Sequence, residues 1–309
     1  MEPAPHEGGV MRIVLGFDGS DAARVAHQFI LHRAWPPATE VVVVAAAAPV
    51  VDWGAMVPAT TGVPAIADLR NLTAQADEAA DELRAHGLTA SVDAEIGDPA
   101  GRISECAERS FADLIVVGNR RRGPFASAVL GSVAATLVDH APCPVLVARS
   151  TNATRMLLAA DGTPSSRDIP RLLDNWGPAF HGLPVEVLSV AVRNDAITPW
   201  VTGNEREEDL VEHERVAQGV ADELMELGWH AAAIARFGVP DREIVGAAET
   251  WGADLIVTGS RGIGTIRRLV AGSVAHDVLL HSSSSVLVMR GHVWAKVHHP
   301  ARVGMPALA

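Results

Sequence analysis

The sequence predicts an α/β protein of two tandem domains, each built on a parallel sheet of five strands with helices on both faces. Three observations lead to this fold class. The chain repeats itself, strand-like and helix-like segments alternate within each repeat, and the strand-like segments are apolar throughout. Apolar strands that alternate with helices are typical of a covered parallel sheet. A chain of 309 residues is long enough for two such domains.

The repeat is defined by a strand, a glycine-rich loop and the start of a helix. Three pairs of equivalent residues are each 141 positions apart: Asp113 and Asp254, Gly118 and Gly259, and Gly131 and Gly272. The two halves also begin alike, with an apolar run followed by Asp-Gly-Ser at 18–20 and Asp-Gly-Thr at 161–163. Such a run predicts a first strand, a tight turn and a capped helix. The chain is therefore a duplication.

The elements follow from the periodicity of each segment. In the first half we expect strands at about 12–17, 41–47, 89–96, 113–118 and 144–148, and helices at about 20–33, 65–86, 99–110 and 131–140. The long second helix is predicted from apolar residues at helical spacing: Ile66, Leu69, Leu72, Ala76, Ala79 and Leu83. In the second half we expect strands near 154–160, 184–190, 230–237, 254–259 and 285–290, with helices between them. The predicted domains are 11–150 and 154–291, flanked by a disordered N-terminus, 1–10, and a C-terminal tail, 292–309.

The glycine-rich loops predict anion binding. In each half a loop leaves a buried strand and ends at the first turn of a helix, at Gly131-Ser132 and at Gly272-Ser273. Backbone N–H groups of such a loop and of the first helical turn converge on one point and can hold a phosphate. Glycine allows the backbone to approach that phosphate closely.

Composition excludes several classes of function. The net charge of −12, with acidic residues in excess in both halves, argues against nucleic-acid binding. No apolar run is long enough to cross a membrane. The two cysteines, Cys106 and Cys143, have no metal-binding spacing and fit a reducing, cytoplasmic location. Lys296 is the only lysine, so neither half has a P-loop lysine.

These residues resemble the universal stress protein family in its tandem form. The resemblance rests on Asp-Gly-Ser after the first strand and on Gly-x2-Gly-x9-Gly-Ser after the fourth, and it covers about 11–149 and 154–290. It implies two doubly wound, Rossmann-like sheets of order 3-2-1-4-5 that pack as an internal pseudo-dimer through the final strand of each half. Pairing these two apolar edges would remove an aggregation liability.

The resemblance also implies ATP as ligand, with Mg²⁺ as an optional companion ion. Ligands of such sheets bind at the carboxyl ends of the strands, where the strand order reverses. The implied contacts in the first half are Gly16, Asp18, Ala46, Gly118, Gly131, Ser132 and Val133. Those in the second half are Ala159, Asp161, Val190, Gly259, Gly262, Gly272, Ser273 and Val274. The first half departs from the motif at Arg121, which stands where the second half has Gly262 and which either crowds the phosphates or pairs with them.

Three functions are compatible with these patterns. The first is an ATP-occupied stress or dormancy regulator with little or no hydrolysis, because no base or lysine is evident outside the loops. It would act on an unidentified regulatory protein, and a homodimer is compatible with the sequence. The second is a scaffold with vestigial phosphate loops. The third is an adenylate-handling enzyme of the same fold class, although its usual first-strand phosphate loop or histidine-rich signature is missing after Leu15 and Leu158.

Overall fold

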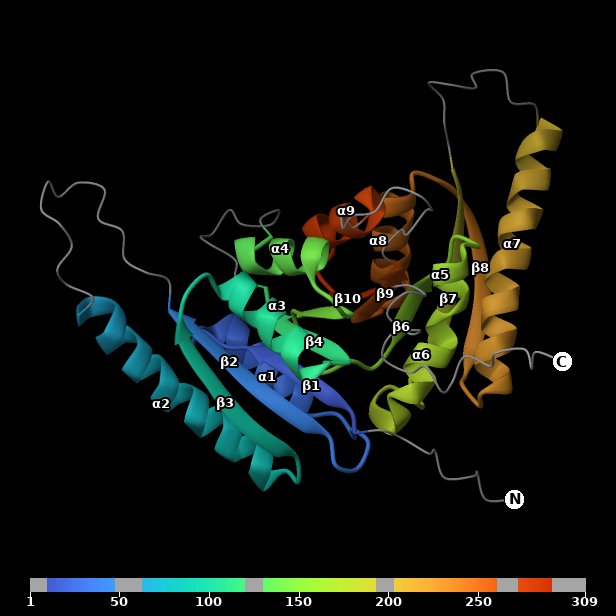
Figure 1. The fold of residues 1–309 in the computed structure, drawn as a ribbon. Coiled ribbons are helices and arrows are strands. Elements are labelled where there is room, and N and C mark those ends of the chain that lie inside the picture. Colours follow the sequence, from blue (N-terminus) through green and yellow to red (C-terminus); the bar gives the residue numbers. More distant parts are fainter. Residues whose placement is uncertain (1–9, 48–62, 120–129, 193–202, 260–271, 291–309) are drawn as a thin grey trace, which may run out of the picture.

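The computed structural model describes residues 10–47, 63–119, 130–192, 203–259 and 272–290. The two halves share one ten-stranded sheet of order β3-β2-β1-β4-β5-β10-β9-β6-β7-β8. Each half contributes the predicted order 3-2-1-4-5. In the second half this order runs in the opposite direction along the sheet, so that the final strands of the two halves meet in the middle (Figure 1). The tandem α/β fold is thus confirmed.

The first half follows its predicted elements to within about two residues. Its strands are β1 (Arg12–Gly16), β2 (Glu40–Ala47), β3 (Thr89–Ile96), β4 (Leu114–Gly118) and β5 (Val145–Ala148). Its helices are α1 (Asp21–Leu31), α2 (Val63–Ala85), α3 (Pro99–Ser110) and α4 (Ser132–His140). The buried side of α2 carries Ala76, Ala79 and Leu83, as its periodicity predicted, and Leu69 and Leu72 are half-buried.

The second half repeats these elements with one difference in its first helix. Its strands are β6 (Met156–Ala159), β7 (Val185–Val192), β8 (Ala231–Gly238), β9 (Leu255–Gly259) and β10 (Ser285–Met289). Its longer helices are α7 (Gly203–Glu226), α8 (Pro240–Trp251) and α9 (Ser273–His281). In place of one continuous first helix it has α5 (Pro164–Arg167), α6 (Ile169–Asn175) and the 3₁₀ turn η1 (Gly177–Ala179). Pro170 and Pro178 follow the two interruptions directly and explain them, because proline lacks the N–H that helix continuation needs.

The halves meet through their final strands. β5 and β10 pair antiparallel with Leu146 opposite Leu287, whereas the neighbouring pairs β4–β5 and β9–β10 are parallel. Both leucines are completely buried. The predicted pairing of the two apolar edges is confirmed, and it turns the two five-stranded sheets into one.

A reciprocal exchange of arginines reinforces this junction. Arg149, just after β5, donates to the carbonyl of Ser284 at 2.9 Å and to that of Leu279 in the last turn of α9. Arg290, just after β10, donates to the carbonyl of Val138 in α4 at 2.7 Å. The last carbonyls of a helix have no partner within the helix, and a cation at this end complements the helix dipole. Each half therefore caps a helix of the other.

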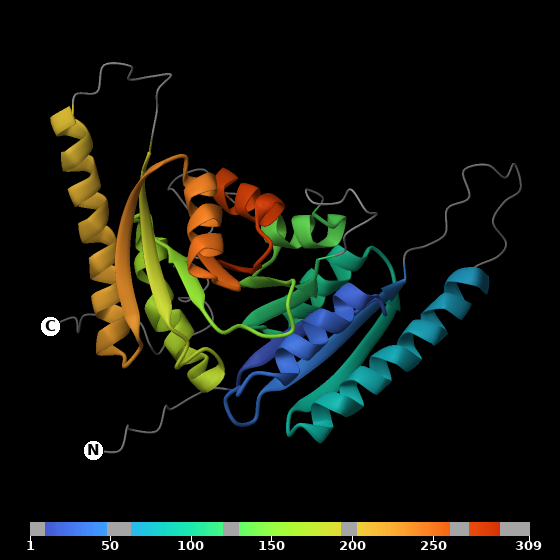
Figure 2. The same ribbon diagram turned by 180° about the vertical axis from the view of Figure 1, so that it is seen from behind.

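The helices lie on both faces of the strongly twisted sheet. Figure 1 shows α3 in front of the first-half strands, and the reverse view in Figure 2 shows α1 in front of them. α2 packs along β2 and β3 at one end of the molecule, and α7 packs in the same way along β7 and β8 at the other. In both views α4 and α9 lie near each other at the middle of the molecule. Across the ranges that the structure describes, no helix has the length and apolar character to cross a membrane.

Candidate functional site

A cavity of about 680 Å³ opens at the carboxyl ends of the first-half strands. Its walls come from β1, β2 and β4, from the first turns of α1, α3 and α4, and from one face of α2. All seven first-half residues expected in the site, apart from Arg121, line it: Gly16, Asp18, Ala46, Gly118, Gly131, Ser132 and Val133. The cavity thus lies where β1 meets β4, at the reversal of strand order.

The carboxylate of Asp18 shapes the turn that follows β1. It accepts hydrogen bonds from the backbone N–H of Ser20 at 3.0 Å and from the Ser20 hydroxyl. Ser20 in turn caps α1, because its Oγ accepts from the N–H of Ala23 at 3.2 Å. Asp18 is exposed to the cavity, so it both holds this turn and presents a carboxylate to a ligand.

The N-terminus of α4 supplies the donors for an anion. Gly131 is its N-cap and has no side chain to accept a bond from the first turn. The first N–H groups of a helix have no partner within the helix and, together with the helix dipole, favour a negative charge. Gly131, Ser132 and Val133 line the cavity, so these donors lie beside it. This end of the cavity suits a phosphate.

Two of the candidate glycines have packing reasons of their own. A Cβ atom at Gly118 would lie 2.0 Å from the carbonyl oxygen of Ala22, and one at Gly16 would lie 2.6 Å from Cδ1 of Ile103. The close approach of β4 to α1 therefore requires Gly118, whether or not a ligand binds. At Gly259, its counterpart in the second half, the described residues place nothing within 4 Å of such a Cβ.

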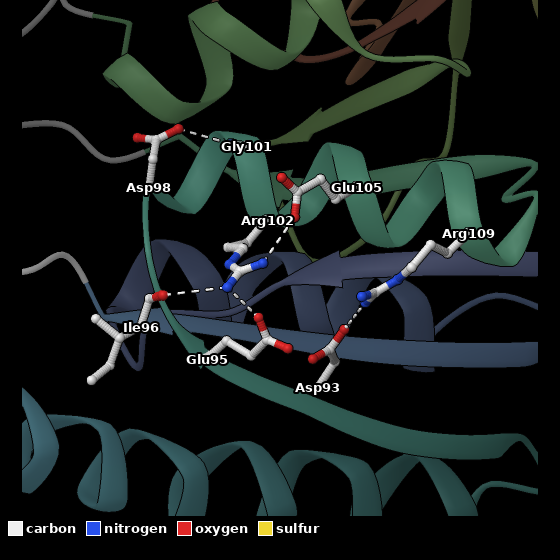
Figure 3. Close-up of polar contacts among 8 residues, drawn as sticks. All are labelled: Asp93, Glu95, Ile96, Asp98, Gly101, Arg102, Glu105 and Arg109. Carbon is white, nitrogen blue, oxygen red and sulfur yellow. Dashed lines mark hydrogen bonds and ion pairs between the residues drawn. The ribbon is translucent and has the colours of Figure 1, made fainter.

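The α3 wall of the cavity is fixed to the edge strand β3 by ion pairs. In Figure 3, Arg102 lies between Glu95 and Glu105. It forms an ion pair with Glu95 of β3 and donates to Glu105 at 2.9 Å. Asp98 caps α3 by accepting from the N–H of Gly101 at 2.8 Å. This network holds the helix that contributes Pro99 and Ile103 to the cavity.

The second half keeps this strand-to-helix ion pair with its charges reversed. Arg236 of β8 and Glu243 of α8, each 141 positions after Glu95 and Arg102, are 3.7 Å apart. Both pairs are partly exposed, with side chains between 31% and 42% accessible. The contact was therefore kept through the duplication while the identities of its acid and base were exchanged.

Several lining residues were missed by the sequence reasoning. The polar ones with side chains long enough to reach a ligand lie on α2: Asp68, Asn71 and Gln75. Their spacing of three and four residues places them on one helical face, adjacent to the apolar face that the periodicity identified. That spacing was the available signal, but it does not by itself distinguish a ligand-facing stripe from a solvated one.

The described part of the second half shows the same framework. Ala159 ends β6, Gly259 ends the neighbouring strand β9, and Val190 lies on β7 on the other side of β6. Asp161 accepts from the N–H of Thr163 at 3.0 Å, which repeats the Asp18 turn. Gly272 is the N-cap of α9, again without a side-chain cap, and Ser273 and Val274 begin that helix. Arg121 and Gly262 lie outside the described residues, as do residues 1–9 and 291–309 of the two predicted terminal segments.

Neither Cys106 nor Cys143 is among the residues that line the cavity, and both are buried. Burial raises the pKa of Cys106 to about 11, and the nearby carboxylate of Asp93 adds to this shift. Burial also raises the pKa of Cys143. Both thiols are therefore protonated near neutral pH and are poor nucleophiles or metal ligands. Among the residues that the structure describes, no group of three or more His, Cys, Asp or Glu side chains could hold a metal ion.

Fold and site together define a tandem, doubly wound α/β protein with a candidate ligand pocket at the reversal of strand order. The model of the universal stress protein family matches residues 9–149 and 153–290, and the chain belongs to that family. Universal stress protein Rv2005c of Mycobacterium tuberculosis is 29% identical over 303 residues, which cover 90% of this chain and 96% of that protein. A universal stress protein of Thermus aquaticus is 34% identical over 140 residues, covering 44% of this chain and 97% of that protein.

A solved structure agrees on the fold. The crystal structure of a universal stress protein from Archaeoglobus fulgidus superposes with a TM-score of 0.61 at 19% identity, over 90% of this chain and 98% of that one. This similarity spans both halves and therefore includes their relative arrangement.

Proposed function

We propose that the protein binds an adenosine nucleotide, ATP, in each half and acts as a nucleotide-occupied regulator rather than as a fast enzyme. The observation that carries the proposal is the 680 Å³ cavity, which gathers the described candidate residues of the first half around the uncapped N-terminus of α4. Cavities that hold small ligands and cofactors measure about 300–1,000 Å³. The first turn of α4 and Ser132 would hold the phosphates, and any Mg²⁺ would bind mainly to phosphate oxygens and water.

Slow hydrolysis follows from the groups that line the cavity. Its described lining includes the carboxylates of Asp18 and Asp68 but no His, Lys or Arg side chain. Phosphoryl transfer needs groups that stabilise the developing charge and orient the attacking water. The two carboxylates add negative charge and supply no such stabilisation. A nucleotide that is retained rather than consumed suits a regulator of stress or dormancy, acting through a partner protein in the cytoplasm.

The test is mass spectrometry of the full chain under native conditions, followed by calorimetric titration of the nucleotide-free protein. We expect up to two ATP molecules for each chain. Gly131→Val and Gly272→Val should each weaken binding at one site by about 1–3 kcal/mol, because the added side chain obstructs charge-assisted bonds to the phosphates. Gly219→Val is the control, since no described residue lies within 4 Å of a Cβ at that exposed helical position.

Three results would contradict the proposal. Unchanged ATP affinity in both glycine variants would show that the nucleotide does not bind at these helix N-termini. No binding at all would favour a ligand-free scaffold. Turnover at several ATP per second in a contaminant-free preparation, close to the median enzyme rate of about 10 per second, would favour an enzyme.

A further inference from the structure

The end of the first-half cavity opposite α4 is lined by polar residues of α2, and one of these residues has an apolar counterpart in the second half. α2 packs on β2 and β3, on the far side of β1 from β4 and α4 (Figure 1). If phosphates bind at the first turn of α4, the remainder of the nucleotide extends across β1 towards α2. The α2 side chains that line the cavity, Asp68, Asn71 and Gln75, therefore face the base and the sugar.

Gln75 lies directly over the Asp-Gly-Ser turn. A Cβ built on Gly19, whose φ is +70°, would lie 2.6 Å from Gln75 Oε1. In the second half, a Cβ built on Gly162, whose φ is +75°, would lie 3.2 Å from Cγ2 of Val216. Gln75 on α2 and Val216 on α7 thus contact equivalent turns of the two halves from equivalent positions, which are 141 residues apart in the chain. One half presents a carboxamide at this point, and the other presents a methyl surface.

The carboxamide of Gln75 is only weakly engaged within the protein. Arg24 Nη2 donates to Gln75 Oε1 at 3.5 Å, and Gln75 Nε2 donates to the carbonyl of Asn71 at 3.5 Å. Hydrogen bonds of good geometry are about 0.5 Å shorter. The side chain is half-buried. It can therefore turn to a ligand without losing strong bonds.

We infer that Gln75 determines base specificity in the first half by pairing with adenine. This inference rests on the proposed function. A carboxamide offers an acceptor and a donor side by side, which matches the N6 amine and N7 of adenine; guanine presents acceptors at both O6 and N7. Gln75 then favours adenine over guanine nucleotides, whereas Val216 gives the second half no such preference from this position. The duplication has thus produced one selective site and one permissive site.

The experiment measures the ratio of ATP to GTP affinity at one site at a time by calorimetry. The first site is isolated in the full chain carrying Gly272→Val, and the second in the chain carrying Gly131→Val. Gln75→Val in the first background should lower the ATP-to-GTP ratio about tenfold, within the range that a two-point base contact provides. Val216→Gln in the second background is the matched reciprocal change and should raise that ratio. Gln75→Glu, which keeps the acceptor but loses the donor, should bind ATP more weakly than the parent.

The outcomes separate this inference from the proposed function. Nucleotide binding with the same ATP-to-GTP ratio in the parent and in Gln75→Val would overturn the role of Gln75 and leave nucleotide binding intact. A parent chain that binds neither nucleotide would overturn both. Melting temperatures of all variants, measured without nucleotide, show whether a change in the ratio comes from the site or from lost stability.

Discussion

At the scale of single residues, the two halves show that one motif position can serve different purposes. Gly118 and Gly259 both end the fourth strand of their half, and the sequence pattern assigns both to phosphate binding. Among the described residues, a packing reason is found for Gly118, where the carbonyl of Ala22 leaves no room for a Cβ atom, and none for Gly259. Pattern reasoning cannot separate these reasons, because the required residue is the same in both cases.

This difference yields a prediction for a matched pair of variants. Gly118→Ala should destabilise the protein by about 1–3 kcal/mol, as overpacking against a backbone atom does. Gly259→Ala should change stability by no more than about 0.5 kcal/mol, because no described residue lies within 4 Å of the new methyl group. Thermal and denaturant unfolding of both variants measure the difference. Equal stabilities would show that α1 moves away from β4 at little cost.

At the scale of elements, the strands were the most predictable part of the chain. Apolar runs marked the central strands, because a strand buried on both faces has little choice of residue. The edge strand β3 differs, since it carries Ser91, Asp93 and Glu95 and is only partly buried. For the first helical segment of the second half only a helix between two strands was predicted, and the structure divides that segment into α5, α6 and η1. The contribution of α2 to the site was not predicted. Asp68, Asn71 and Gln75 are polar residues of the kind that also occur on a helix face exposed to solvent. Only the path of α2 past β2 brings them to the cavity.

The exchange of arginines between the halves is also invisible in the sequence and leads to a prediction. Arg149→Met and Arg290→Met keep the aliphatic stem of each side chain but remove its bonds to the helix carbonyls. We expect each variant to lose about 1–3 kcal/mol of stability, since hydrogen bonds to charged groups are the stronger ones and the carbonyls of Ser284 and Val138 would lose these donors.

The control for this pair is Arg215→Met. Arg215 pairs with Glu212 on the surface of α7, and its side chain is 69% accessible. An exposed pair of this kind contributes at most about 1 kcal/mol. If all three variants unfolded at the same temperature, the caps would have no special role at the junction of the halves.

At the scale of the whole molecule, the duplication joins two equivalent halves in one sheet. The antiparallel β5–β10 pair and the reciprocal arginine caps relate the halves by an approximate two-fold axis. Each half covers the apolar final strand of the other, so neither final strand is left as an open edge. Because the two halves are joined covalently, each can diverge without losing its partner, as Gln75 and Val216 already have.

This symmetry predicts how the first half behaves when it is produced alone, as residues 1–150. The strand β5, which has four residues, would lose its pairing with β10. The β5 strand of a second copy can take the place of β10 in the same antiparallel register. We expect a homodimer by analytical ultracentrifugation, with the amides of residues 145–148 protected from hydrogen exchange as they are in the full chain. Arg149→Met should weaken this dimer, because Arg149 would then cap α4 of the other copy. A half that remains monomeric at high concentration, with those amides unprotected, would show that β5 does not need a paired edge and that the covalent link alone holds the halves together.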